Sequence, residues 1–161
     1  MTDDKTPAAL AADIDAARLR LTDFVTRCPA AHWLAAPVDG DPRPVGVIAD
    51  HVAHAYEYLT GFITDLVAGH QVAVDSDIID GLNAAHAEAA DALSPEQVAG
   101  HLRASGEELA ALVAGLEPGQ LEIGDGRVRR FAVIAARHAD IHRAEIEAGL
   151  TSHARPPGRA S

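Results

Sequence analysis

The sequence has a single cysteine, Cys28, and aromatic residues make up only 4% of its 161 residues. One cysteine excludes an intramolecular disulfide. Hydrophobic residues nevertheless reach 48% and are mostly Ala, Leu, Val and Ile, which favours packed helices over an aromatic-rich sheet. The length suits one domain with a sizeable core. Because Cys28 falls on an apolar helical stripe, we interpret it as a small buried hydrophobe rather than a reactive thiol.

Basic residues are also scarce. Thirteen Lys and Arg residues stand against 24 Asp and Glu residues, which gives a formal net charge of −11, and Lys5 is the sole lysine. A protein that neutralises phosphates needs a basic face, so the composition argues against general nucleic-acid binding. The same shortage disfavours binding to anionic membrane surfaces. A small-molecule substrate or a protein partner is therefore the better expectation.

Long apolar runs are missing as well. The stretch MTDDKTPAAL lacks the basic region and the long apolar run of a signal peptide, and no segment approaches transmembrane length. These absences predict a cytoplasmic protein. The preference for arginine over lysine, together with abundant alanine, is typical of a GC-rich genome.

Four segments carry the periodicity of amphipathic helices, with apolar residues recurring every three or four positions. Pro7 suits the first turn of the first segment, and Pro29 stops it. Ser94, Pro95 and Gln97 form a helix-start pattern in which Ser caps the helix and Gln follows three residues later. The predicted helices cover residues 7–28, 45–69, 94–116 and 128–150.

The connection between the second and third predicted helices is long. We expect residues 29–43 to form a turn-rich link, and residues 75–93 to form an irregular crossover ending in a shorter helix. Such a crossover would leave the second and third helices parallel. The sequence therefore predicts an all-α four-helix bundle with a crossover between helices 2 and 3, as a single domain over residues 1–150 with a flexible tail over 151–161. Homodimer formation is a further expectation, because small bundles often cover leftover apolar surface that way.

Two of the nine histidines, His138 and His142, stand four residues apart in the stretch RHADIHRAEIEAGL. Projection at about 100° per residue places both on the apolar side of the last predicted helix. Two imidazoles at positions i and i+4 on one helical face can bind the same ion. A core rarely tolerates polar groups in its middle without compensation, so this face is a candidate metal site.

The second predicted helix supplies a candidate third ligand. His51 projects into the apolar arc, whereas His54 falls about 60° further round. His54 thus lies at the boundary with a solvent face that we expect to hold Asp50 and Glu57. His51 is the better ligand, and His54 is expected to support the site or to face solvent. We interpret the remaining histidines as solvated: His32, His70, His86, His101 and His153.

Three local patterns resemble the DinB-like metal-binding family, whose four-helix bundles are related to thiol-dependent S-transferases and to mycothiol-dependent maleylpyruvate isomerases. These are RPVGVIADHVAHAYEYL, IIDGLNAAHAEAADALSPEQVAGHL and RFAVIAARHADIHRAEI. The resemblance implies that His51, His138 and His142 bind the metal. The Trp often found before the second helix of this family is replaced here by Arg43 or Pro44, a difference that bears on substrate more than on fold.

Three neutral imidazoles leave a divalent ion with open coordination positions, as in catalytic sites. Zinc and nickel suit such ligands best, and iron is compatible with them. The ion would lower the pKa of bound water to about 7 or would hold a thiolate. The family resemblance favours a low-molecular-weight thiol cosubstrate, for which a GC-rich genome suggests mycothiol. The predicted activity is an S-transferase or isomerase acting on a small electrophile.

Other functions remain open at this point. A metal-dependent hydrolase, a non-catalytic metal- or ligand-binding stress protein, and a structural bundle all fit the same residues. Glu145, one turn beyond His142, is the candidate catalytic residue; it would orient a ligand histidine, act as a general base, become a fourth ligand, or simply reach solvent. The cluster of Arg127, Arg129 and Arg130 is interpreted as binding a substrate carboxylate or as pairing with local acids.

Overall fold

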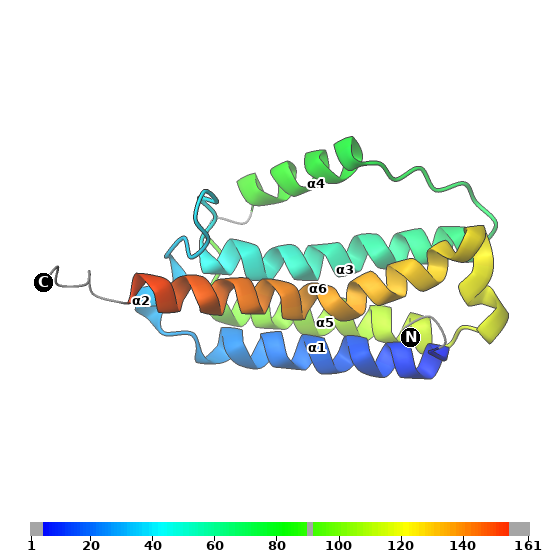
Figure 1. Cartoon of the computed structure of the whole chain (residues 1–161), viewed down its shortest axis with the longest axis horizontal. Helices are drawn as coiled ribbons and strands as arrows, with labels where there is room; N and C mark the ends of the chain where they lie inside the picture. The colour runs from blue at the N-terminus through cyan, green and yellow to red at the C-terminus, as the bar shows by residue number, and fades with distance from the viewer. Residues whose placement is uncertain (1–4, 90–91, 155–161) are drawn as a thin grey trace, which may run out of the picture.

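The structure is a computed structural model, and it describes residues 5–89 and 92–154. Four long helices pack side by side, and the described residues contain no strand (Figure 1). None of the described helices is both long enough and apolar enough to cross a membrane. The long helices are α1 (Pro7–Arg27), α3 (Val45–Val67), α5 (Pro95–Ala114) and α6 (Ile123–His153).

The helix starts follow from the capping residues. The hydroxyl of Thr6 accepts a hydrogen bond from the amide of Ala9, and Pro7 occupies the first turn of α1. Ser94 and Gln97 form the predicted capping box at the start of α5. In α6, residues 124–126 have positive φ angles, so the regular right-handed helix begins just after Gly126, close to its predicted start. α6 continues to His153, three residues into the predicted tail, and residues 155–161 lie outside the described residues.

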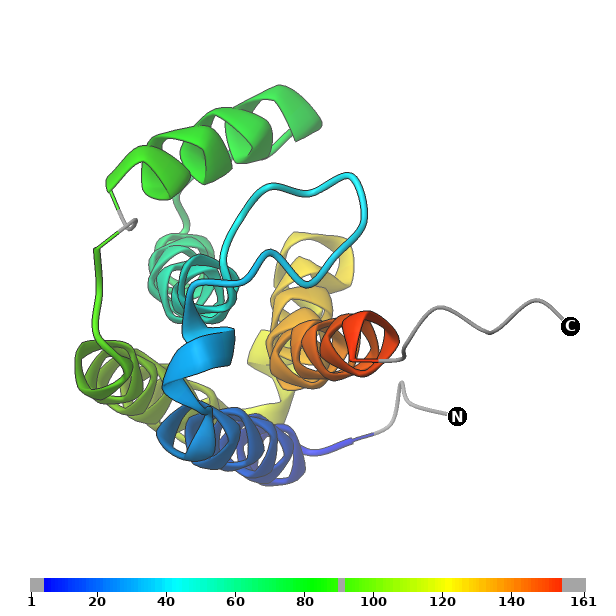
Figure 2. The same cartoon turned by 90° about the vertical axis from the view of Figure 1, so that its left-hand side faces the viewer.

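A long connection links α3 to α5, and it is more helical than the sequence predicts. Helix α4 (Ser76–Ala89) spans most of the segment. It begins at Ser76 because the Asp75 carboxylate accepts a hydrogen bond from the amide of Ile78 at 2.9 Å and caps the helix. Figures 1 and 2 show α4 outside the bundle, running back along α3, so that α3 and α5 are parallel and α1 and α6 run the opposite way.

The link before α3 also contains a short helix that the sequence did not indicate, α2 (Ala30–Trp33). It buries the Trp33 side chain against the bundle, and the indole nitrogen donates a hydrogen bond to the carbonyl of Leu93 at 2.9 Å. The Trp33 ring also lies directly over Gly46, near the start of α3. This contact anchors the end of the bundle at which α3 begins.

The core is built from small and branched aliphatic side chains on the inner faces of the four long helices. α1 packs against α5 and α6, and α3 packs against the same two helices. The fully buried side chains include Leu10, Ile14, Leu21, Ile48, Ile63, Leu102, Leu109 and Ile146. Such packing sets α3 beside α6 and α3 beside α5, the two helix pairs from which the polar clusters below are drawn.

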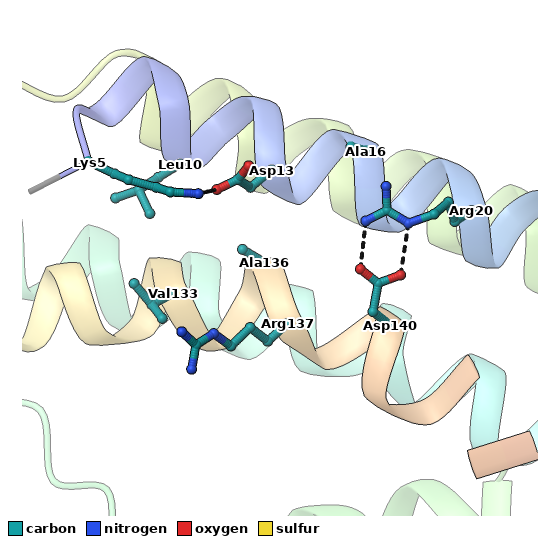
Figure 3. Close-up of a pocket in the computed structure, with 9 residues that line it drawn as sticks. All are labelled: Lys5, Leu10, Asp13, Ala16, Arg20, Val133, Ala136, Arg137 and Asp140. Carbon is teal, nitrogen blue, oxygen red and sulfur yellow. Dashed lines mark hydrogen bonds and ion pairs between the residues drawn. The ribbon is translucent and has the colours of Figure 1, made fainter. Parts of the chain in front are cut away.

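A polar cavity of about 260 Å³ opens between α1 and α6 (Figure 3). Arg20 on α1 and Asp140 on α6 form a bidentate salt bridge along its wall, with N–O distances of 2.9 and 2.6 Å. Lys5 and Asp13 form a second pair there. Both pairs are partly exposed, and the Arg20–Asp140 pair joins α1 to α6.

Candidate metal centre

Three histidines meet between α3 and α6. His51 lies two turns into α3, and its side chain is buried between the helices. His138 and His142 lie one turn apart on α6 and face it. The centroid of the His51 ring is 5.1 Å from those of both partners, and the centroids of His138 and His142 are 4.5 Å apart. The structure thus brings together the three residues that the sequence singled out as metal ligands.

The imidazole nitrogens converge on one point. Nε2 of His138 is 3.2 Å from Nε2 of His51, and one nitrogen from each of the three rings lies within 4.8 Å of the others. Two nitrogens at that distance repel each other if both present lone pairs, unless a proton or a cation lies between them. This geometry therefore fits a metal ion bound by three imidazoles.

The protonation of the three rings supports the same conclusion. Burial lowers the pKa of His51 to about 3 and that of His138 to about 4, and repulsion from neighbouring imidazolium charges contributes to both shifts. Burial also lowers the pKa of His142, against the opposing effect of Glu145. The rings are therefore neutral at physiological pH, the form in which imidazole binds metals.

Glu145 lies on the outer side of His142. Its Oε2 is 3.0 Å from Nδ1 of His142, and about half of its side chain is exposed. A carboxylate that accepts a hydrogen bond from one ring nitrogen fixes the tautomer and leaves the other nitrogen free to bind a metal. Of the roles considered for Glu145, this geometry matches the orientation of a ligand histidine.

An apolar cavity of about 280 Å³ opens beside two of the three histidines. α4 supplies part of its wall, so the crossover helix covers the site rather than merely connecting two helices. Ile134 lines this cavity, and its side chain is 48% exposed. The cavity is lined by His51, Ala55, Tyr58, Leu59, Phe62, Val74, Ile79, Leu82, Asn83, Phe131, Ile134 and His138.

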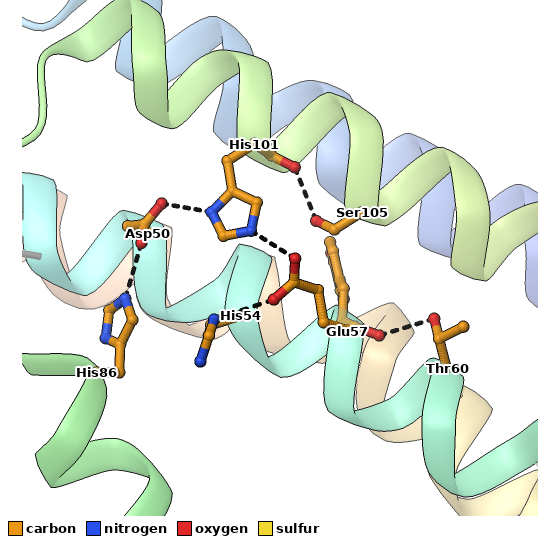
Figure 4. Close-up of polar contacts among 8 residues, drawn as sticks. Asp50, His54, Glu57, Thr60, His86, His101 and Ser105 are labelled. Atoms are coloured by element: carbon orange, nitrogen blue, oxygen red, sulfur yellow. Dashed lines mark hydrogen bonds and ion pairs between the residues drawn. The ribbon is translucent and has the colours of Figure 1, made fainter. Parts of the chain in front are cut away.

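A second polar network lies around Asp50 on α3 (Figure 4). It shows that the predictions of a solvent-facing Asp50 and of solvated His86 and His101 were wrong. Asp50 is 3% exposed rather than on the solvent face. His86 is buried, and its Nε2 lies 2.7 Å from one oxygen of Asp50; Nδ1 of His101 lies 2.7 Å from the other. Neither histidine is simply solvated, because each comes from a helix that packs over the Asp50 face of α3.

The electrostatics of this network centre on Asp50 and His101. Burial raises the pKa of Asp50, but hydrogen bonds from His101 and His86 outweigh that effect and hold the pKa far below its usual value. The hydrogen bond to Asp50 raises the pKa of His101 to about 9 despite partial burial, and Glu57 adds to the increase. Projection of single helices missed these contacts because each contact joins two different helices. The available signal was Asp50, an acid directly beside the inward-facing His51 in the sequence.

None of the three arginines at the start of α6 lines the apolar cavity. Arg129 pairs with Glu122 at 2.6 Å, and Arg130 donates to the carbonyl of Asp125. Arg127 lies over the Phe131 ring, with its guanidinium carbon 5.6 Å from the ring centroid. The interpretation of local pairing is therefore confirmed for Arg129. Arg43, which stands before α3, forms an ion pair with Asp41 at 2.7 Å.

Comparison with known families identifies a superfamily. The sequence profile of the DinB superfamily matches residues 13–146, which include all three histidines of the metal centre. No curated protein and no solved structure matches the chain.

Proposed function

The chain belongs to the DinB superfamily, and from this premise we propose that it is a divalent-metal-dependent enzyme that uses a low-molecular-weight thiol to attack a small, largely apolar electrophile. The observation that carries the proposal is the convergence of three neutral imidazoles, two of which line an apolar cavity. A divalent ion held by His51, His138 and His142 would lower the pKa of a bound thiol or water.

The cavity supports the choice of substrate. Its walls are mostly aliphatic and aromatic, and Tyr58 and Asn83 are the neutral polar side chains among its lining residues. Apolar walls would hold a hydrophobic group of the substrate, and one or two polar groups would orient it. The position of His51 and His138 at the wall would place that substrate next to the metal ligands.

The lining also favours a thiol over hydrolysis. A metal-dependent hydrolase commonly uses a carboxylate as general base beside the metal. Among the described residues that line the cavity there is no carboxylate, and Glu145 contacts the far side of His142. A thiol that loses its proton on binding needs no such base during the reaction, so these surroundings suit a thiolate nucleophile.

Metal analysis of the untagged protein tests the first half of this proposal. We expect one strongly held divalent ion at the triad, lost in His51→Ala, His138→Ala and His142→Ala. His70→Ala is the matched control, because His70 is exposed, pairs with Asp65 and does not belong to the triad. Full metal content in the triad variants, or no metal in the wild type, would show that the metal centre is wrong.

Turnover tests the second half. The metal-loaded protein is assayed against a panel of small apolar electrophiles, with and without added thiol, and mycothiol is included in the thiol set. We expect product only when thiol is present, and none from His138→Ala. Turnover that is independent of thiol would favour a hydrolase, and metal binding without turnover would favour a non-catalytic binding protein; either result contradicts the thiol proposal.

A further inference from the structure

Ligand atoms also converge at a second place, between α3 and α5. One ligand atom each from His54, Glu57 and His101 lies within 4.8 Å of the others. Nδ1 of His54 is 3.0 Å from one oxygen of Glu57, and Nε2 of His101 is 3.0 Å from the other. Figure 4 shows the Glu57 carboxylate between the two rings. A single carboxylate thus faces two imidazole nitrogens that come from different helices.

The His101 ring is held in place by a contact of its Nδ1 with Asp50. Its Nδ1 lies 2.7 Å from Asp50, whose second oxygen is held by Nε2 of the buried His86. A carboxylate on one ring nitrogen of a histidine is the arrangement that turns the other nitrogen toward a metal. The direction of His101 Nε2 toward Glu57 is therefore set by a buried network that ties together α3, α4 and α5.

We propose that His54, Glu57 and His101 form a second divalent-cation site, with Asp50 orienting His101. Two imidazoles and one carboxylate form a donor set that suits a transition-metal ion such as Zn²⁺ better than Mg²⁺ or Ca²⁺. Binding a divalent ion would displace the proton that His101 holds in the ion-free network, and the ion would then offset the negative charges of Asp50 and Glu57. The side chains of His54, Glu57 and His101 are 31%, 47% and 29% exposed, which leaves access for the ion and for water ligands.

The second site is distinct from the His51 centre, although both use α3. His51 and His54 are three residues apart on this helix, and the ring of His86 lies near both, with its centroid 6.1 Å from that of His51 and 4.9 Å from that of His54. The ligand sets share no residue. The proposal therefore does not depend on the proposed enzyme activity, and the two ions can be removed independently.

A calorimetric titration with Zn²⁺ tests the proposal on the full chain. Wild type is expected to bind two ions, and the triple variant His51→Ala, His138→Ala, His142→Ala is expected to retain one. Adding His54→Ala to this triple variant should weaken the remaining binding at least tenfold, whereas adding His70→Ala should leave it unchanged. If the triple variant binds no Zn²⁺, or if His54→Ala has no more effect than His70→Ala, the second site is wrong.

Glu57→Gln gives an independent test with little change in shape. The amide can still form a hydrogen bond, but it removes the negative charge that would bind the cation. We expect at least a tenfold loss of Zn²⁺ affinity in the triple-variant background, with unchanged helix content by far-ultraviolet circular dichroism. Undiminished affinity would mean that the cluster only links the helices. A wild type that binds one ion, retained in the triple variant, would instead refute the His51 centre.

Discussion

Nε2 of His138 on α6 lies 3.2 Å from Nε2 of His51 on α3. The two residues are 87 positions apart in the sequence, and the contact exists because α3 and α6 pack side by side in opposite directions. Once this contact is made, the one-turn spacing on α6 brings His142 to the same point. A sparse pattern of three histidines thus becomes one site through the packing of two helices.

Glu145 is expected to strengthen metal binding through His142. Glu145→Ala removes the carboxylate that holds Nδ1 of His142, so the affinity of the triad for Zn²⁺ should fall by about 10- to 100-fold. Competition against a chromophoric chelator measures the change. Glu147→Ala is the matched control, because Glu147 lies on the same helix with similar exposure and pairs with Arg143. Equal affinities in the two variants would make Glu145 a surface acid without a role in binding.

The apolar cavity is expected to bind hydrophobic molecules through the wall that includes Ile134. Ile134→Asp places a carboxylate at this wall, which should weaken binding of an apolar fluorescent probe about tenfold, a cost of about 1.4 kcal/mol. Ile141→Asp is the control, since Ile141 is 51% exposed against 48% for Ile134 but does not line the cavity. A fluorescence titration that shows the same loss in both variants would place the probe elsewhere.

The sequence predicted the features that depend on one helix at a time. The periodicity of each segment predicted the four long helices, and Ser94 and Gln97 predicted the start of α5. The helical projection predicted that the His51 side chain faces the core. Each of these follows from local geometry, in which residues three or four apart share a face.

Features that depend on contacts between helices were missed. The projection of α3 alone assigns Asp50 to the solvent face, because it does not show that α4 and α5 bring His86 and His101 over this residue. The length of α4 was underestimated because the cap that Asp75 forms at its start was not recognised in the sequence. The apolar cavity likewise needs α3, α4 and α6 together. Such contacts are set by tertiary packing, which no single-helix pattern contains.

The pair formed by His101 and Asp50 is expected to make stability depend on pH in the alkaline range. The pKa of His101 is raised to about 9 in the folded protein, whereas an unfolded histidine has a pKa of about 6.5. The folded state therefore holds a proton that the unfolded state has lost, so this contribution is complete below about pH 6.5 and declines as the pH rises through 9. Urea unfolding of the metal-free protein should show the decline.

His101→Asn should flatten the pH dependence between 6.5 and 9, because asparagine does not titrate there. His32→Asn is the control, since His32 is an exposed residue on α2. The acidic groups that face His101 are Asp50 and Glu57, both on α3. A His101→Asn variant with the same alkaline decline as wild type would show that another group is responsible.

Gly46 is expected to be required for the packing of the Trp33 ring against α3. A Cβ atom at this position would lie 2.7 Å from a carbon of the indole ring, and the ring cannot easily retreat because it is buried and its nitrogen is bonded to Leu93. Gly46→Ala should therefore destabilise the protein by about 1–3 kcal/mol, as overpacking does in other cores. The midpoint of urea unfolding measures the loss.

Gly61→Ala provides the opposite expectation within the same helix. Gly61 lies in α3, and a Cβ atom added there would meet no atom within 4 Å, so alanine should stabilise the helix by about 0.5–1 kcal/mol through its higher helix propensity. Because both variants make the same chemical change in α3, the difference in sign isolates the contact with Trp33. If Gly46→Ala is as stable as Gly61→Ala, the ring moves freely and does not fix the start of α3.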